Sequence, residues 1–331
     1  MKAVFFKTIE ELAESNKDIF ILTGDLGFKL FDNFRGKYPD KFYNIGVAEA
    51  NMISIAAGLS LCSKSVYCYS IIPFLVMRAF EQIRVDVAYQ NLNVKLIGFG
   101  AGFSYSLEGF THFGLEDLAL MRTLPNMTIV VPASIYEARC LAKASLEYKG
   151  PIYIRLERAE EAITYQKSYD FRYRSLDLEI GKAMLLREGK DIAIFAIGNM
   201  VNSGKKVADL LASKGISVTL VNMHTLKPLD SETIMQIAST HEAIFSLEEH
   251  IIDGGLGSAI AEVLAEGNYN GCFKRIGIEK LKHSIGNTDF LREEHGLTIE
   301  KIYCKVLESI GEGNLLRVLK MADFGAEVKT I

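Results

Sequence analysis

The chain has 331 residues, 49% of them hydrophobic, and a formal net charge of −4. It is longer than the roughly 250–300 residues at which a single hydrophobic core stops growing, so two domains are expected. Acids and bases are interspersed, which excludes an extended basic surface for nucleic acid. The sequence has no export signal, no apolar run of about 18 residues and no CxxC spacing. It therefore predicts a soluble, cytoplasmic protein that does not enter a membrane and keeps its five cysteines reduced.

In the first half, short β-branched runs alternate with segments of helical periodicity, a pattern typical of βαβ units around parallel strands. The strand candidates are residues 18–24, 65–71, 93–100, 127–132 and 151–156. The helix candidates between them are residues 46–62, 73–90, 115–124 and 134–148. This half is expected to form one parallel sheet covered by helices.

A polar stretch near residues 158–178 breaks both periods, and a second alternating series follows it. Its strand candidates are residues 191–197, 217–223, 242–248 and 273–278, and its helix candidates are residues 203–215, 230–240 and 257–267. The predicted fold class is α/β, with two doubly wound domains whose sheets are largely parallel. We expect a first domain at residues 1–158, a linker at 159–178 and a second domain at 179–331.

Two glycine-rich segments are candidate ligand loops. "LIGFGAGF" follows a predicted strand, but Phe103 occupies the third glycine position of a dinucleotide fingerprint, which favours a tight turn beside a ligand or another backbone. The loop from Gly254 to Ser258 runs into a predicted helix, whose free N–H groups could bind an anion or simply allow close packing. The six histidines show no ligand spacing, so no metal site built by this chain is expected.

Two polar residues lie where parallel sheets bind ligands. His112, in "GFTHFGLEDLALMR", follows a strand and could act as acid, base or hydrogen-bond donor, or could cap the helix predicted from Leu115. Glu49, in "FYNIGVAEANM", lies in the first turn of a predicted helix, where an acid complements the helix dipole without any chemistry. The pattern alone favours that structural role for Glu49 and leaves both roles open for His112.

Five segments together resemble the C-terminal half of transketolase-like thiamine diphosphate enzymes, which consists of a pyrimidine-binding domain and a transketolase C-terminal domain. They are "FYNIGVAEANMISIAAGLSL", "RAFEQIRVDVAYQNLNVKLIGFGAG", "EGFTHFGLEDLALMRTLPNMTIVVPAS", "VNMHTLKPLD" and "EEHIIDGGLGSAIAE". They occur in the family's order and extend over nearly the whole chain, which makes the resemblance more specific than any single motif.

The resemblance implies that Glu49 hydrogen-bonds a ring nitrogen of the cofactor's pyrimidine. Sharing a proton there favours the imino tautomer, which removes the proton from the thiazolium carbon and so creates the ylid that attacks a ketone. To hold this proton the carboxylate needs apolar surroundings, which nearby apolar side chains are expected to provide. They are Ile45, Val47, Met52 and Ile53. Phe74 corresponds to the aromatic residue that stacks on the pyrimidine, with simple core packing as the alternative.

The resemblance also implies which residues contact the substrate. His112 corresponds to the histidine that hydrogen-bonds oxygens of the substrate or intermediate. Glu108 and Phe113 depart from the usual aspartate and glutamine of this loop, which is expected to alter the space for a sugar chain. Arg158 corresponds to an arginine that reaches a substrate phosphate, although neighbouring glutamates oppose that role.

The family's diphosphate-binding half, with its G-D-G motif and a later asparagine, has no counterpart in this sequence. The resemblance therefore implies a separate N-terminal subunit that binds the diphosphate of thiamine diphosphate and its Mg²⁺. The expected assembly is an α₂β₂ heterotetramer that self-associates through the pyrimidine domains. Its expected substrates are sugars or sugar phosphates.

The function implied is that of the C-terminal, β-type subunit of a split transketolase, which transfers a two-carbon ketol unit. The alternatives are a deoxyxylulose phosphate synthase-like carboligase, the β subunit of a 2-oxo acid dehydrogenase, and a non-catalytic scaffold. The "THFGLED" loop argues against the dehydrogenase, and the presence of both Glu49 and His112 argues against the scaffold. The sequence does not identify the donor or the acceptor.

Overall fold

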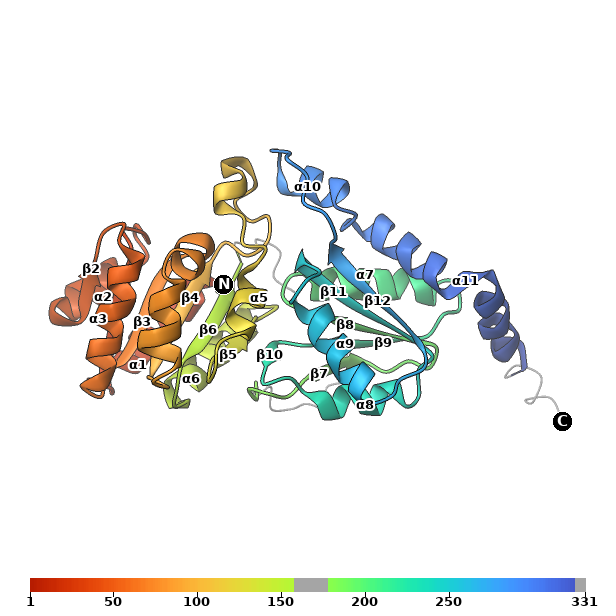
Figure 1. The fold of residues 1–331 in the computed structure, drawn as a ribbon, viewed down its shortest axis with the longest axis horizontal. Coiled ribbons are helices and arrows are strands. Elements are labelled where there is room, and N and C mark those ends of the chain that lie inside the picture. The colour runs from red at the N-terminus through yellow and green to blue at the C-terminus, as the bar shows by residue number, and fades with distance from the viewer. Residues whose placement is uncertain (158–177, 325–331) are drawn as a thin grey trace. The chain divides into compact units, whose positions relative to one another are not determined.

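The structure is a computed structural model that describes residues 1–157 and 178–324, with side chains described as far as Gly311. It contains two compact units (Figure 1): the first holds residues 1–181 and 225–228, and the second holds residues 182–224 and those from 229 onward. The predicted linker lies, apart from Leu178, outside the described residues. Within the described part of the chain, no helix combines the length and apolar character needed to cross a membrane.

The first unit is built on a seven-stranded sheet. Its strands are β1 (Ile19–Thr23), β2 (Phe42–Asn44), β3 (Ser65–Ile71), β4 (Val94–Phe99), β5 (Thr128–Val130), β6 (Ile152–Leu156) and β10 (Thr225–Lys227). They lie in the order β10-β5-β6-β4-β3-β1-β2, and every pair is parallel except β10 with β5. The five strands predicted in this half are all present, and β10 is an unpredicted edge strand from the second half of the chain.

Helices cover both faces of this sheet. The α-helices are α1 (Lys2–Ala13), α2 (Asp32–Lys37), α3 (Glu49–Leu61), α4 (Phe80–Gln82), α5 (Asp117–Arg122) and α6 (Ile135–Glu147). The 3₁₀ helices are η1 (Pro39–Lys41), η4 (Ser106–Glu108) and η5 (Phe110–His112), and the π-helices are η2 (Pro73–Met77) and η3 (Ile83–Ala88). On one face, α1, α2 and α6 enclose a core with apolar residues of the strands. On the other, α3 (Figure 1) and η2 pack on β3 and β4, as alternation along the strands requires.

The helix predicted at residues 73–90 is interrupted by π-helical turns. The N–H groups of Arg78 and Tyr89 donate to the carbonyls of Pro73 and Arg84, five residues back, at 3.3 and 2.9 Å. Such turns change which side chains point toward the sheet and are frequent at functional sites. The apolar spacing could not reveal them, because it suits an ordinary α-helix equally well.

The second unit has a five-stranded sheet. Its strands are β7 (Met184–Arg187), β8 (Ile192–Ala196), β9 (Val218–Asn222), β11 (Ala243–Ile251) and β12 (Cys272–Ile278). Their order is β12-β11-β8-β9-β7, with only the β7–β9 pair antiparallel. The helices are α7 (Met200–Ala212), α8 (Ser231–Ala238), α9 (Leu256–Glu266), α10 (Thr288–Glu294) and α11 (Ile299–Phe324), the last broken at Gly311 with φ 70°. The prediction of two α/β domains with mostly parallel sheets is confirmed.

Side-chain caps fix where several of these helices begin. Ser134 and Asp230 accept hydrogen bonds from the backbone N–H of Glu137 and Thr233, at 3.0 and 3.1 Å. Each cap satisfies a donor that would otherwise lack a partner in the first turn. Both residues stand at the first position of a predicted helix, so local chemistry explains why α6 and α8 appear where the periodicity placed them.

Candidate functional site

Glu49 lies at the carboxyl ends of β1 and β3, where open α/β sheets bind their ligands. It is the first residue of α3 and its side chain is 1% exposed. Ser70, on β3, donates to its Oε1 at 2.9 Å, and Arg78 donates to its Oε2 at 2.6 Å. Gly24, directly after β1, leaves room for the carboxylate, because a Cβ there would lie only 3.0 Å from Oε1. The acid is therefore buried but has polar partners from other elements.

The expected apolar surroundings of Glu49 are not what the structure shows. Met52 and Ile53 are buried in the core, but Val47 is 69% exposed. The nearest partners of the carboxylate are the Arg78 guanidinium and the Ser70 hydroxyl. The physical reason is that a buried, unpaired carboxylate costs far more than a paired one, so the chain supplies a cation from its own surface.

Phe74 connects Glu49 to the His112 loop. The guanidinium carbon of Arg78 lies 4.7 Å from the centroid of the Phe74 ring. On the same ring, the His112 imidazole packs edge to face, with centroids 5.0 Å apart and an interplanar angle of 74°. Phe74 is only partly buried, so its ring is not simply part of the core. Glu49, Arg78, Phe74 and His112 thus form one continuous row, which we call the Glu49–His112 row.

His112 ends η5, and its ring is held by neighbours in the loop. Thr111 Oγ1 lies 2.9 Å from Nδ1, and the Tyr105 ring lies 5.8 Å away between centroids. When the hydroxyl donates to Nδ1, the neutral ring carries its proton on Nε2. The helix that this histidine was alternatively expected to cap begins only at Asp117. The ring instead packs against Phe74.

A buried ion pair anchors the His112 loop to β6, and the sequence pattern did not reveal it. Asp117 Oδ2 accepts from Arg155 Nε at 2.8 Å and from the Tyr153 hydroxyl at 2.6 Å, while Arg155 Nη2 donates to the Gly114 carbonyl at 2.6 Å. Burial, followed by the charge of Asp117, raises the pKa of Tyr153, so its hydroxyl stays protonated. Burial, the largest single influence, would lower the pKa of Arg155, but Asp117, Tyr153 and Glu157 together outweigh it and the pKa is raised. The loop is therefore fixed to β6 by a buried, hydrogen-bonded ion pair.

The "LIGFGAGF" segment is a tight turn against another backbone. Gly102 N–H donates to the Gly114 carbonyl at 2.9 Å, and Gly114 N–H donates back at 3.2 Å. Gly100 has φ +95°, and a Cβ there would lie 2.5 Å from the Tyr105 ring. These glycines allow the segment after β4 to pair with the loop that carries His112.

Three other predicted residues lie outside the Glu49–His112 row. Glu108 is exposed on η4, and among the described residues no hydrogen bond or ion pair joins it to the row. Phe113 is 3% exposed, and its ring packs on Phe103 with centroids 5.2 Å apart. Arg158 lies outside the described residues.

In the second unit, the chain itself occupies the predicted anion site before α9. The Glu248 carboxylate accepts from the N–H groups of Leu256 and Gly257 at 2.7 and 2.8 Å. Gly255 must be small, since a Cβ there would lie 2.0 Å from Glu248 Oε2. His250 is completely buried and its Nδ1 lies 2.6 Å from the Ile251 carbonyl. The loop from Gly254 to Ser258 thus allows close packing around an internal cap.

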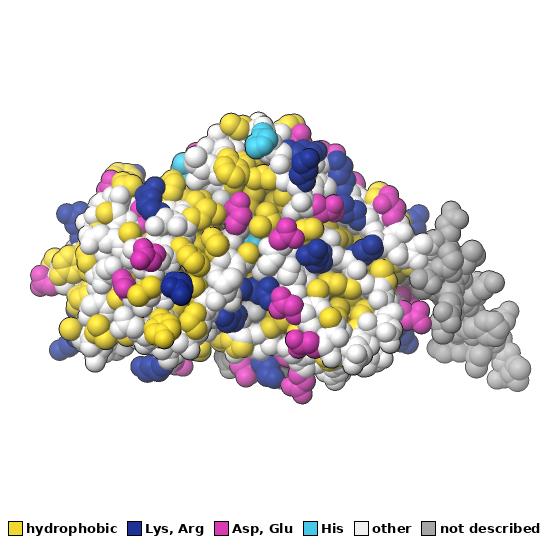
Figure 2. All heavy atoms as spheres, viewed as in Figure 1, with side chains coloured by type: hydrophobic (Ala, Val, Ile, Leu, Met, Phe, Trp, Pro, Cys, Tyr) yellow, Lys and Arg dark blue, Asp and Glu magenta, His cyan; other side chains and the backbone are white. Residues whose placement is uncertain are grey.

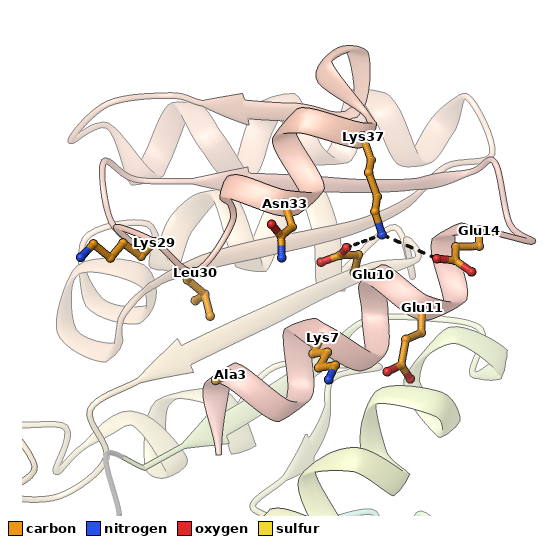
Figure 3. A pocket seen from close by; sticks show the side chains of 9 residues that line it. All are labelled: Ala3, Lys7, Glu10, Glu11, Glu14, Lys29, Leu30, Asn33 and Lys37. Carbon is orange, nitrogen blue, oxygen red and sulfur yellow. Dashed lines mark ion pairs between the residues drawn. The ribbon is translucent and has the colours of Figure 1, made fainter.

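A shallow hollow between α1 and α2 offers no comparable chemistry. Figure 3 shows its lining side chains, which are mostly charged, and Lys37 pairs there with Glu10 at 2.7 Å and Glu14 at 3.6 Å. Lys37 is thus held by two glutamates, one in α1 and one directly after its end. Across residues 1–157 and 178–311, whose side chains are described, no cluster of three or more His, Cys, Asp or Glu side chains could hold a metal ion.

The residues of the row fit the pyrimidine part of a thiamine cofactor. Glu49 Oε2 accepts a hydrogen bond from Arg78, whose side chain is partly exposed. An N–H donor of a ligand could therefore replace Arg78 at this oxygen. Phe74 offers an aromatic face beside this position, already covered by a flat guanidinium. An acceptor and a stacking surface at one point are what a planar nitrogen heterocycle requires.

Comparisons with known proteins agree with this geometry. Residues 1–162 match the family "Transketolase, pyrimidine binding domain" and residues 181–302 match "Transketolase, C-terminal domain". A "Putative transketolase C-terminal section" of Methanocaldococcus jannaschii is 36% identical over 94% of this chain and 96% of its own length. The "6-deoxy-6-sulfo-D-fructose transketolase subunit SqwH" of Clostridium sp. is 36% identical over 91% of this chain and 92% of its own length.

A solved structure described as "Split gene transketolase, inactive beta4 tetramer" is also similar. It has 36% sequence identity and a TM-score of 0.81, and the match covers 93% of this chain and 97% of that one. The pyrimidine-binding domain implies thiamine diphosphate as the cofactor. The chain therefore belongs to the transketolase family, and within it to the C-terminal subunits of split transketolases.

Proposed function

We propose that this chain is the β-type subunit of a thiamine diphosphate-dependent transketolase that transfers a two-carbon ketol unit between sugars or sugar derivatives. The observation that carries the proposal is the Glu49–His112 row, which places an acid, an aromatic ring and an imidazole side by side at the carboxyl ends of the strands. These are the three kinds of group that cofactor activation and substrate handling need.

Glu49, Phe74 and His112 each have a separate proposed role, supported by the Asp117–Arg155 pair. Bound thiamine diphosphate supplies the carbon nucleophile and electron sink. Glu49 shares a proton with a pyrimidine ring nitrogen, and Phe74 holds the ring by stacking. His112 donates or accepts a proton at the substrate oxygens, with its ring oriented by Thr111 and Tyr105. Asp117 and Arg155 act indirectly, by fixing the loop that carries His112.

We assign the diphosphate and Mg²⁺ to a separate N-terminal subunit, in an α₂β₂ assembly that self-associates through the pyrimidine domains. Apolar side chains exposed on α3, on the π-helices η2 and η3, and at Tyr89 just after η3 support a docking partner, and hydrophobic side chains are seen on the surface of the first unit in Figure 2. They are Ile55, Leu61, Met77, Val85 and Tyr89, which are 37–76% exposed. Of the helices that carry them, α3 and η3 are held together by Ser54, whose hydroxyl donates to Asp86 at 2.7 Å. Exposed apolar surfaces of this kind mark protein contacts.

Reconstitution tests the proposal. The chain alone should neither bind thiamine diphosphate tightly nor transfer a ketol unit, whereas the complex with a diphosphate-binding subunit and Mg²⁺ should do both. Activity should be measured with a panel of ketose donors and aldose acceptors, with and without phosphate. Tight, magnesium-dependent cofactor binding by the chain alone would contradict the split assembly. Carbon dioxide release from a 2-oxo acid would instead support a carboligase or a dehydrogenase.

A further inference from the structure

Arg78 contacts both residues that we assign to the cofactor ring. Its Nη1 donates to Glu49 Oε2 over 2.6 Å, and its guanidinium carbon lies 4.7 Å from the centroid of the Phe74 ring. The planar Arg78 guanidinium donates an N–H to Glu49 and lies over the Phe74 ring. A planar nitrogen heterocycle bound here would make the same two contacts. We propose that Arg78 is a resident competitor that occupies the pyrimidine site until the cofactor displaces it. This inference rests on the proposed function.

The Glu49–Arg78 pair is strongly asymmetric, which makes exchange feasible. Glu49 is 1% exposed and cannot reach water, whereas the Arg78 side chain is 43% exposed. The acid therefore needs a donor at all times, but the arginine can turn into solvent at small cost. The Asp117–Arg155 pair is different, because both of its side chains are at most 2% exposed. Of these two ion pairs, only Glu49–Arg78 therefore has a partner, Arg78, that can turn away into solvent.

The position of Arg78 in the chain explains its reach. It directly follows the π-helix η2, and its N–H bonds to the Pro73 carbonyl five residues back. This wider turn allows Phe74 and Arg78 to stack while Arg78 also meets Glu49. The cofactor must compete with the contact that Arg78 already makes to Glu49. Its apparent affinity is therefore reduced by the fraction of molecules in which Arg78 has turned away and left the site open.

The test compares cofactor binding among three variants, each assembled with the diphosphate-binding subunit and Mg²⁺. Arg78→Met removes the competing donor and should tighten the calorimetric Kd for thiamine diphosphate by about tenfold or more. Arg78→Lys keeps the charge but cannot lie flat on Phe74, so its Kd should fall between those of Arg78→Met and wild type. Arg139→Met removes an exposed arginine whose ion pair with Glu11 measures 3.9 Å, and should leave the Kd unchanged.

A second readout uses the isolated full-length chain. Arg78→Met should lower its melting temperature more than Arg139→Met does, because the buried Glu49 loses its cation. Should Arg78→Met not fold, Arg78→Lys carries the binding test and should still bind more tightly than wild type.

The outcomes separate the two proposals. If the wild-type complex binds thiamine diphosphate and the Arg78 variants bind it equally or more weakly, Arg78 is not a competitor. The proposed function would be unaffected by that result. A wild-type complex that binds no thiamine diphosphate would overturn the proposed function, and the competitor with it.

Discussion

Glu49 in the first unit and Glu248 in the second are equally buried acids near the start of a helix, but their partners differ. Both oxygens of Glu248 accept from backbone N–H groups of α9. Glu49 accepts from two side chains, one of them the partly exposed Arg78. Backbone donors cannot leave without unfolding a helix turn, whereas a side chain can rotate away. The partner of Glu49 can therefore be exchanged for a ligand, whereas the partners of Glu248 cannot.

The largest effect is expected when the carboxylate of Glu49, but not that of Glu248, is replaced by an amide. Glu49→Gln keeps the size of the side chain but replaces the proton-sharing carboxylate with an amide. In the reconstituted complex, hydrogen–deuterium exchange at the thiazolium carbon of bound thiamine diphosphate should slow by about 10²- to 10⁴-fold. Glu248→Gln is the matched control and should leave the exchange rate near the wild-type value. Equal rates in Glu49→Gln and wild type would remove Glu49 from the reaction.

A third buried acid, Asp117, differs from Glu49 and Glu248 because its partner, Arg155, is itself a buried charge. Asp117→Ala leaves Arg155 buried without its carboxylate and should lower the free energy of unfolding by about 3–5 kcal/mol, measured by urea denaturation. The double variant Asp117→Leu with Arg155→Met should recover most of this loss, because no charge then remains buried. A single variant as stable as wild type would show that the pair does not anchor the His112 loop.

His112 should affect turnover without affecting cofactor affinity. His112→Ala removes the imidazole proposed to handle the substrate oxygens, so kcat should fall by about 10²-fold. The Kd for thiamine diphosphate, measured in the same complex, should stay near the wild-type value, since Glu49 and Phe74 remain. Thr111→Val, which removes only the hydroxyl beside Nδ1, should have a smaller effect on kcat. Loss of cofactor binding in His112→Ala would assign this residue to the cofactor site instead.

The smallest effect is expected at Glu248. Glu248→Ala leaves the N–H groups of Leu256 and Gly257 without their acceptor and should lower the free energy of unfolding by about 1–3 kcal/mol. Amide hydrogen exchange at these two residues should accelerate, while the reconstituted complex keeps its kcat. A fully folded variant without activity would mean that Glu248 is more than a cap.

The sequence was sufficient for features that depend on local pattern. Alternating periodicity predicted the two α/β domains. The family resemblance implied Glu49, Phe74 and His112 as site residues, and the side chains of these three residues lie in one row. Arg78 was missed because its position depends on π-helical turns that apolar spacing does not reveal.

Features that join distant parts of the chain could not be read from the sequence. Asp117 and Arg155 are 38 residues apart and meet only through sheet order. The same limit explains the wrong expectation for Glu49: side chains near it in sequence are apolar, but its partners Ser70 and Arg78 come from other elements. A buried carboxylate needs polar or charged partners, and a pattern read along the chain does not show which residues the fold brings to it.

Strand β10 has a consequence for how the protein can be divided. Residues 225–228 complete the sheet of the first unit, although the chain on either side of them belongs to the second. A fragment that ended at residue 181 would leave β5 as an open edge, with unpaired backbone groups that invite aggregation. During synthesis the first sheet also stays incomplete until residues 182–224 of the second unit have been made. The two units are therefore not separable modules, and an exchange of domains between relatives must carry this short strand along.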